Sequence, residues 1–204
     1  MAEAVRALTL RHAVITSVTR DDLPDGGAAA FAAVIAQIRA LQPGCAVEAL
    51  IPDFQGRPEP LRAVMAARPD VLNHNVETVP RLFPHVQPRN RYDWSLGVLA
   101  EAKRLWPQGR TKSGLMVGLG ESADEVLAVM ADLRQVGVDI LTVGQYLQPT
   151  RQHLPIARYY TPQEFETFRQ EGLALGFRWV ESGPLVRSSF HAEEQAQRLS
   201  DAGE

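Results

Sequence analysis

Side chains that could bind an amino-acid head group follow the first predicted strand. Two hydroxyl residues, Thr16 and Ser17, are succeeded by Arg20, Asp21 and Asp22. Hydroxyl and carboxylate oxygens accept hydrogen bonds from an ammonium group, and an arginine donates them to a carboxylate. The same residues also suit an ordinary turn before a helix. Both interpretations of this segment stand at this point.

A second polar segment, Asn73-His74-Asn75, ends another predicted strand, and Glu77 lies close by. Asparagine both donates and accepts hydrogen bonds, which suits ribose hydroxyls and peptide amides. The five histidines lack a metal-ligand spacing, so a packed His74 is favoured over a metal ligand. Asp53 follows the predicted strand Ala46–Ile51 and is a further candidate for contact with substrate.

The turn Gly118-Leu119-Gly120-Glu121 separates a predicted strand from a predicted helix. Such a turn can hold an anion at the helix N-terminus, although many strand–helix turns need glycine only for their geometry. One open alternative is therefore a barrel enzyme with acid–base or phosphate chemistry, built from Asp53, His74, Glu77 and this turn.

These segments need a scaffold that brings strand ends together. Apolar runs alternate with amphipathic helices, which predicts a parallel α/β architecture. The predicted strands are Ala13–Val18, Ala46–Ile51, Val71–Asn73, Ser113–Val117 and Ile140–Val143, with a final extended piece at Phe177–Val180. One helix shows an apolar stripe of Phe31, Val34, Ile35, Ile38 and Leu41. Two later helices begin with capping boxes, Ser122 with Glu125 and Thr161 with Glu164.

This order predicts part of a (β/α) barrel, in which ligand-binding groups lie where strands end. Residues 2–10 resemble the second half of a helix with no strand before it, so we expect the first βα unit to be missing. The barrel is expected over residues 1–184, and a C-terminal tail over residues 185–204.

The composition is that of an ordinary globular protein, with 45% hydrophobic and 22% charged residues. No apolar run is long enough to cross a membrane, and the first residues do not form a signal peptide. A net charge of −3 argues against general nucleic-acid binding. The single cysteine, Cys45, cannot form an internal disulfide and is expected to be a buried thiol. We therefore predict a cytoplasmic protein that binds neither membrane nor nucleic acid.

The tail carries Arg187-Ser188-Ser189, which on its own would be read as part of an ordinary polar C-terminal tail. Together with Asn73–Thr78, Lys112–Glu121 and Gly144–Thr150, it makes the chain resemble the lipoyl synthases of the radical SAM superfamily. The resemblance runs from about residue 1 to about residue 195. It implies a partial barrel of the radical-SAM type.

The resemblance also implies roles for particular residues. The segment from Thr16 to Asp22 would face S-adenosylmethionine (SAM), and Asn73 and Asn75 would line the pocket for SAM and substrate. Met116 and Gly118 would line the cofactor pocket. A serine of the tail motif would ligate the auxiliary [4Fe–4S] cluster, with Ser189 preferred and Ser188 as the alternative. Arg187 would donate hydrogen bonds to cluster sulfides or to a nearby carboxylate.

In such enzymes a [4Fe–4S] cluster reduces SAM to a 5′-deoxyadenosyl radical. The radical abstracts hydrogen from C6 and C8 of an octanoyl group on a lipoyl carrier domain, and the auxiliary cluster supplies both sulfurs. Implied partners are the octanoylated carrier domains of 2-oxoacid dehydrogenase E2 and of the glycine cleavage H protein. A reductant such as flavodoxin or ferredoxin would supply electrons.

Three departures from the family pattern qualify this reading. Phe190 replaces the usual tyrosine, and Gln87 stands where an arginine is usual. The six cysteines that hold the two clusters are absent. We expect a truncated and inactive copy, and a non-catalytic relative that binds lipoyl carriers is the alternative.

Overall fold

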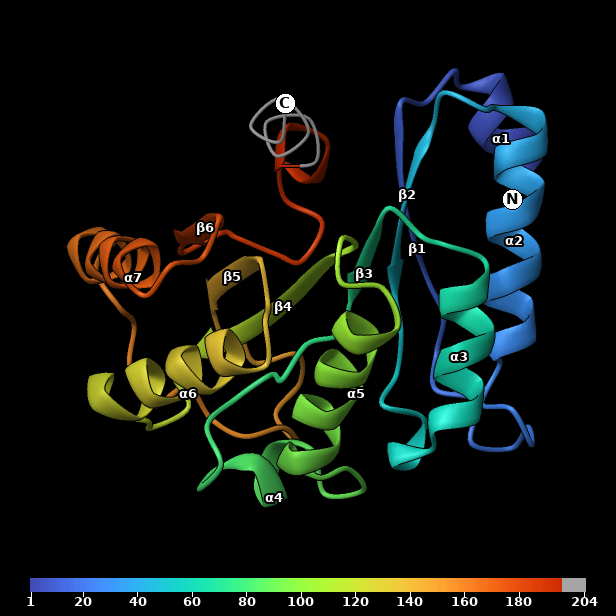
Figure 1. Ribbon diagram of the computed structural model, residues 1–204. Coiled ribbons are helices and arrows are strands. Elements are labelled where there is room, and N and C mark those ends of the chain that lie inside the picture. The colour runs from blue at the N-terminus through green and yellow to red at the C-terminus, as the bar shows by residue number, and fades with distance from the viewer. Residues whose placement is uncertain (196–204) are drawn as a thin grey trace.

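A single parallel sheet organises residues 1–195, which are the residues that the computed structural model describes. Its strands lie side by side in chain order: β1 (His12–Thr16), β2 (Ala46–Leu50), β3 (Val71–Asn73), β4 (Arg110–Val117), β5 (Ile140–Gln145) and β6 (Trp179–Gly183) (Figure 1). Every neighbouring pair is parallel, so all six strands end towards one rim.

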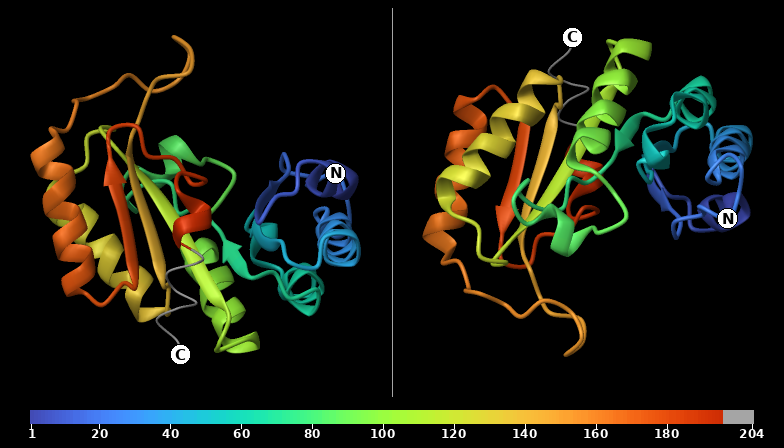
Figure 2. Two further views of the ribbon diagram at one scale, coloured as in Figure 1. Left: turned by 90° about the horizontal axis from the view of Figure 1, so that it is seen from above. Right: turned by 90° about the horizontal axis from the view of Figure 1, so that it is seen from below.

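Helices connect these strands and cover one face of the sheet. They are α1 (Ala2–Ala7), α2 (Ala28–Leu41), the short 3-10 helix η1 (Phe54–Gly56), α3 (Pro58–Ala66), α4 (Phe83–Val86), α5 (Tyr92–Leu105), α6 (Ala123–Gln135) and α7 (Pro162–Ala174). Figure 2 shows the sheet as an arc, with the long helices outside it and the C-terminal segment inside it. The predicted partial (β/α) barrel is confirmed.

The alternation of side chains along the strands explains this arrangement. Outward residues such as Ile15, Val47 and Leu72 pack against helices α2, α3 and α5 in one apolar cluster. Outward residues of β4 to β6 form a second cluster with α6 and α7. The predicted stripe on α2 is confirmed except at its end, where Leu41 is 42% exposed.

Polar residues face the inside of the arc instead. Glu48 on β2 and Lys112 on β4 are both buried, with Lys112 Nζ 3.1 Å from Glu48 Oε1. The side-chain amide of Asn73, on the strand between them, donates to the same carboxylate at 2.7 Å. His12 Nε2 lies 3.6 Å from Glu48 Oε2. Residues of four strands, β1 to β4, thus meet at one buried carboxylate.

Two strands have other bounds than the sequence predicted. β1 ends at Thr16, two residues before the predicted end at Val18, which is 78% exposed and pairs with no strand. β4 begins at Arg110, ahead of the predicted Ser113, in the polar run Arg110-Thr111-Lys112. Both capping boxes are present as predicted. Among residues 1–195, no helix combines the length and apolarity needed to cross a membrane.

Replacing Lys112 tests the buried ion pair. Lys112→Met should lower the free energy of unfolding by about 3–5 kcal/mol, because it leaves the Glu48 charge buried and unpaired. The double variant Glu48→Leu/Lys112→Met should lose much less, since both charges leave together. Urea unfolding measures both variants. Arg104→Met, which breaks the exposed pair with Glu101, is the control and should change stability little, because solvent screens an exposed pair. A single variant no worse than this control would contradict the account.

Candidate functional site

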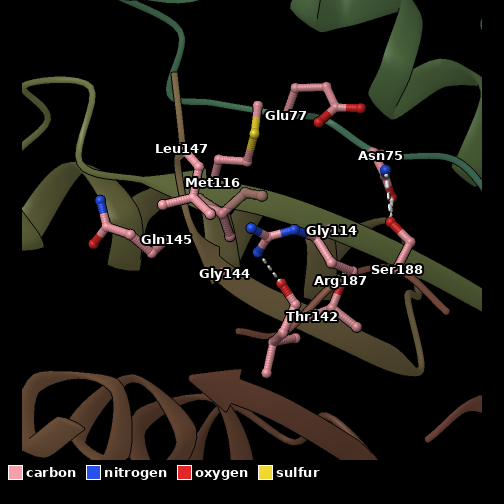
Figure 3. A pocket seen from close by; sticks show the side chains of 12 residues that line it. Asn75, Glu77, Gly114, Met116, Thr142, Gly144, Gln145, Leu147, Arg187 and Ser188 are labelled. Atoms are coloured by element: carbon pink, nitrogen blue, oxygen red, sulfur yellow. Dashed lines mark hydrogen bonds between the residues drawn. The ribbon is translucent and has the colours of Figure 1, made fainter. Parts of the chain in front are cut away.

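Two cavities open at the rim where the strands end. The first, of about 230 Å³, has β4 and β5 as its floor and is covered by Val186, Arg187 and Ser188 (Figure 3). These three residues belong to the segment 184–195, which we call the C-terminal strap. The strap crosses the inner side of the arc, and Arg11 at the β1 edge pairs with Glu193 at 2.5 Å.

Glycines on the inner face make room for the strap. A Cβ at position 144 would lie 2.4 Å from the Val186 carbonyl oxygen, so any side chain there would displace the strap. A Cβ at position 114 would lie 2.5 Å from Thr142 Oγ1 and 2.9 Å from Asn75 Oδ1. Gly114 and Gly144 therefore allow backbone and polar side chains to lie flat on the sheet.

The second cavity, of about 200 Å³, lies over β1, β2 and β3 and is more polar. Thr16 and Ser17 contribute hydroxyls, and Asp53 contributes a carboxylate. Asp53 Oδ1 accepts from the Gln55 backbone N–H at 2.9 Å, while its buried Oδ2 has no partner among the described residues. An amine or hydroxyl donor of a ligand would satisfy that oxygen.

Asn75 and Glu77 line both cavities. The Asn75 side-chain amide donates to Ser188 Oγ at 2.9 Å, which ties the end of β3 to the strap (Figure 3). Ser188 in turn lines the first cavity. The asparagine therefore bridges two segments that are 113 residues apart in the chain.

Glu77 is held at the junction by an unusual backbone. Its φ is +65°, and its N–H and carbonyl bond to Gly114 and Met116 of β4 at 3.1 and 2.8 Å. A non-glycine residue in this region is strained and persists because the surroundings fix it. Burial raises the pKa of the Glu77 carboxyl above its ordinary value, and the nearby Asn75 side chain offsets only part of this.

The loop after β1 is arranged differently from the sequence prediction. Arg20 donates twice to Asp22, at 2.7 and 2.6 Å, so each of these groups satisfies the other. Asp21 is exposed and lines neither cavity. Asp25 accepts from the N–H groups of Gly27 and Ala29 at the start of α2. Of the predicted segment from Thr16 to Asp22, Thr16, Ser17 and Thr19 reach the polar cavity.

The other predicted residues divide into two groups. Met116 lines the first cavity, and Arg187 lines it while donating to the Val186 carbonyl at 2.6 Å. Asn73, in contrast, is fully buried against Glu48 and lines neither cavity. Ser189 is exposed and also lies outside both. Their cofactor and ligand roles remain predictions.

The turn Gly118–Glu121 is closed by its own hydrogen bonds and packs against Gln145. The Glu121 carboxylate accepts from the N–H groups of Gly118 and Leu119 at 2.6 and 2.9 Å, which occupies the donors an anion would use. Gly118 has φ +107°, and a Cβ there would lie 2.1 Å from Gln145 Nε2. Its glycine is needed for this packing, because a side chain would collide with Gln145.

His74 is a satisfied core residue, as the sequence favoured. Its Nδ1 lies 2.9 Å from the Ile51 carbonyl and its Nε2 lies 3.0 Å from Ser95 Oγ. Burial lowers the pKa of His74 because it disfavours the charged ring. With both nitrogens engaged, His74 is poorly suited to the acid–base alternative.

The residues present do not fit an iron–sulfur cluster. Cys45 is buried and its thiol donates to the Ala46 carbonyl at 3.4 Å. Burial raises the pKa of that thiol, which opposes thiolate formation. Among residues 1–195, no group of three or more His, Cys, Asp or Glu side chains could hold a metal ion.

The sequence did not reveal the roles of three residues at this site. Glu77 was named as a neighbour of Asn75 and as a residue of the acid–base alternative, but its place between the two cavities depends on a left-handed backbone that glutamate rarely adopts. Leu147 lines the first cavity although it follows β5 in a loop. Gln145 appears as one more buried residue of β5, yet its side chain holds that loop: Nε2 donates to the Arg158 carbonyl and Oε1 accepts from Tyr160 N–H.

Comparisons with known proteins agree with this geometry. Residues 1–133 match the family model described as the radical SAM superfamily. The lipoyl synthase of Rubrobacter xylanophilus is 61% identical over 197 residues, which cover 97% of this chain and 61% of that protein. The lipoyl synthase of Caldanaerobacter subterraneus subsp. tengcongensis is 55% identical, with 95% of this chain and 68% of that protein covered.

The chain thus spans about two thirds of the length of these relatives. Among solved structures, methylornithine synthase (PylB) is similar in fold, with a TM-score of 0.62 at 11% sequence identity. That alignment covers 99% of this chain and 71% of the other. At this level of identity the similarity concerns the fold alone.

Gly118→Ala tests the packing of the rim. We expect it to lower the free energy of unfolding by more than about 1 kcal/mol, because alanine is strained at this φ and collides with Gln145. Gly97→Ala is the matched control, since Gly97 lies in α5 with no atom near its added Cβ. It should be neutral or stabilising by up to about 1 kcal/mol. Equal effects in denaturant unfolding would contradict this account.

Glu77→Gln tests the half-buried carboxyl through pH. A raised pKa means that the folded protein holds this proton when the unfolded chain has released it, so the parent loses stability as pH rises above about 4.3. The variant should match the parent below pH 4. Above it, the variant should become the more stable by about 1.4 kcal/mol for each pH unit by which the pKa is raised. Urea unfolding from about pH 3.5 to 8 follows the difference. A difference independent of pH would exclude this role for the carboxyl.

Proposed function

Because the chain belongs to the lipoyl synthase family of the radical SAM superfamily, we propose that it forms the SAM- and substrate-binding part of a lipoyl synthase. The complete reaction would insert two sulfurs, at C6 and C8 of an octanoyl group carried by a lipoyl domain. The observation that carries the proposal is the pair of cavities that meet at Asn75 and Glu77, covered by the Arg-Ser-Ser strap.

The polar cavity supports SAM as its occupant. The amino acid part of SAM carries an ammonium group. It can donate hydrogen bonds to the hydroxyls of Thr16 and Ser17 and to the Asp53 oxygen that has no partner. Asn75 and Glu77 stand between this cavity and the next, at a position suited to ribose hydroxyls. Bound there, SAM would supply radical chemistry, and the residues of this chain that line the cavity would hold and orient it.

The first cavity supports the substrate chain and the strap serine. Its floor includes Met116 and Leu115, and its cover includes Arg187 and Ser188. The hydroxyl that reaches this cavity is that of Ser188, so we propose Ser188 as the serine that acts here. Ser189, preferred from the sequence, remains the alternative that mutation can decide. Arg187 would hold negative charge beside the serine.

The described residues supply no cysteine set, so we derive no step through an iron–sulfur cluster. Within the proposal, partners follow from the family: octanoylated lipoyl carrier domains as substrates, and a reductant such as flavodoxin or ferredoxin. We propose a cytoplasmic location, without membrane or nucleic-acid partners.

The test compares this chain alone with a chimera. In the chimera, the part of the Rubrobacter relative that precedes the matching region is placed before Met1. After anaerobic reconstitution with iron and sulfide, the chimera should form lipoyl groups on an octanoylated carrier domain. Mass spectrometry of the carrier domain measures this product. The chain as given should form none, since it holds one cysteine. A chimera that cleaves SAM but never modifies the carrier would contradict the proposed function.

Serine variants of the chimera separate the two candidates. Ser188→Ala should leave 5′-deoxyadenosine formation intact and abolish sulfur insertion, because the serine acts apart from SAM. Ser189→Ala should behave like the parent. The reverse result would return the role to Ser189.

A further inference from the structure

The first strand, β1, forms an open edge of the sheet at one end of the arc (Figure 2). Among the described residues it pairs with β2 alone, through contacts such as the bond from Ala46 N–H to the Arg11 carbonyl. Backbone groups alternate between the two sides of a strand. The N–H and C=O groups of His12, Val14 and Thr16 therefore point towards the open edge, where another strand could pair with them.

This edge lacks the features by which many proteins prevent such pairing. Edge strands are commonly protected by lysine, by proline or by a bulge. The sequence of β1, His12-Ala13-Val14-Ile15-Thr16, contains no proline, lysine or acidic residue. Its residues pair with β2 in unbroken register, so the strand has no bulge. The open side of β1 can accept a second strand over its whole length.

An apolar trough of about 170 Å³ lies beside the end of this strand. Its lining includes Met1, Ile15, Phe31 and Val34. Met1 is 68% exposed, so the trough is open to solvent. Because Met1 precedes α1 and meets the end of β1 here, the helix begins near the end of the strand and leads back towards its start.

Leu8 is an exposed leucine between α1 and the start of β1. Its exposed fraction is 67%. The turn that carries it is fixed, because the N–H group of Leu10 donates to the Val5 carbonyl at 3.1 Å. An apolar side chain held on a fixed turn loses little conformational freedom when a partner covers it.

A twofold axis through Val14 would bring the trough and the leucine together. In an antiparallel pair centred there, Val14 lies opposite Val14 of the second copy, and His12 lies opposite Thr16. Each opposed pair exchanges two backbone hydrogen bonds, which makes about six in all. The start of one strand then lies beside the end of the other, so Leu8 of each copy faces the trough of the other copy.

Charges at the two ends of the strand favour this antiparallel arrangement. The side chain of Arg6, before the strand, is exposed and has no partner among the described residues. Asp21, after the strand, is likewise exposed and unpaired within that part of the chain. The neighbouring Arg20 and Asp22 neutralise each other. An antiparallel pair brings Arg6 of one copy towards Asp21 of the other, whereas a parallel pair would bring like charges together.

We propose that β1 is a dimerisation edge, at which a second copy of this chain pairs antiparallel about Val14 and inserts Leu8 into the apolar trough. The inference is independent of the reaction proposed above. A twofold contact uses the same surface on both copies, so it closes with a dimer and does not extend into a longer assembly.

Sedimentation velocity of the purified chain measures the pairing. We expect a dimer of twice 22.5 kDa that dissociates on dilution. Val14→Pro should weaken dimerisation by about tenfold or more, because it removes an N–H that points to the edge while the bonds to β2 come from the neighbouring residues. A chain that stays monomeric up to its solubility limit, or that forms a series of growing oligomers, would overturn the proposal.

Leu8→Glu tests the same contact outside the sheet. It should also weaken dimerisation by about tenfold or more, because both copies lose an apolar contact and gain a charge. Leu173→Glu is the matched control on α7, at the far end of the sheet, and should dimerise like the parent. Circular dichroism and thermal melting establish that each variant is folded. If folded Leu8→Glu dimerises as tightly as the parent, the proposed contact is wrong.

Cysteine crosslinking tests the register. Val14 lies opposite itself across the axis, so Val14→Cys should form a disulfide between two copies on mild oxidation. Thr16→Cys is the matched control: its two copies would lie about 13 Å apart along the strands, too far for a disulfide. Cys45 is buried and should not react. Equal crosslinking at positions 14 and 16 would overturn the antiparallel pairing about Val14.

Discussion

The buried ion pair between Glu48 and Lys112 is the interaction on which the site depends. It joins β2 to β4 across β3, and Asn73 on the middle strand completes it with a hydrogen bond to the same carboxylate. Such a pair contributes little net stability, because removing two charges from water costs about as much as their attraction returns. What it fixes is the relative position of three strands. Asn75 and Glu77, which follow β3 directly, are placed over β4 as a result.

The inner face of the arc divides into layers with different chemistry. Along β4, Lys112 of the ion pair comes first, Gly114 beneath Asn75 follows, and Met116, which lines the first cavity, lies nearest the end of the strand. In a closed barrel, large side chains would fill this space. Here backbone of the strap takes their place, so a hydroxyl and a guanidinium can approach the floor of the site. Because the strap contributes backbone where large side chains would otherwise lie, room remains for a ligand.

Much of the fold could be read from the sequence, because burial leaves a periodic signal. The five predicted strands are present, the extended piece predicted at Phe177–Val180 overlaps β6 only at its first two residues, and the capping boxes marked two helix starts correctly. The site was harder. Thr16, Ser17, Asn75 and Met116 follow from strand-end placement, but Arg20 and Asp22 neutralise each other locally, which residue types alone do not reveal. Asn73 is the last residue of β3 and donates to the buried Glu48 carboxylate, whereas Asn75 lies beyond the end of the strand and lines both cavities.

The Asn75–Ser188 contact has a consequence for how the molecule comes into being. It closes a loop of 113 residues, so forming it costs more loop-closure entropy than forming a local contact. During synthesis the barrel segments emerge before the strap. A nascent or partly folded chain therefore has an uncovered inner cavity and no serine beside Asn75. The binding centre is therefore complete only when the strap lies against Asn75, beyond the end of β3.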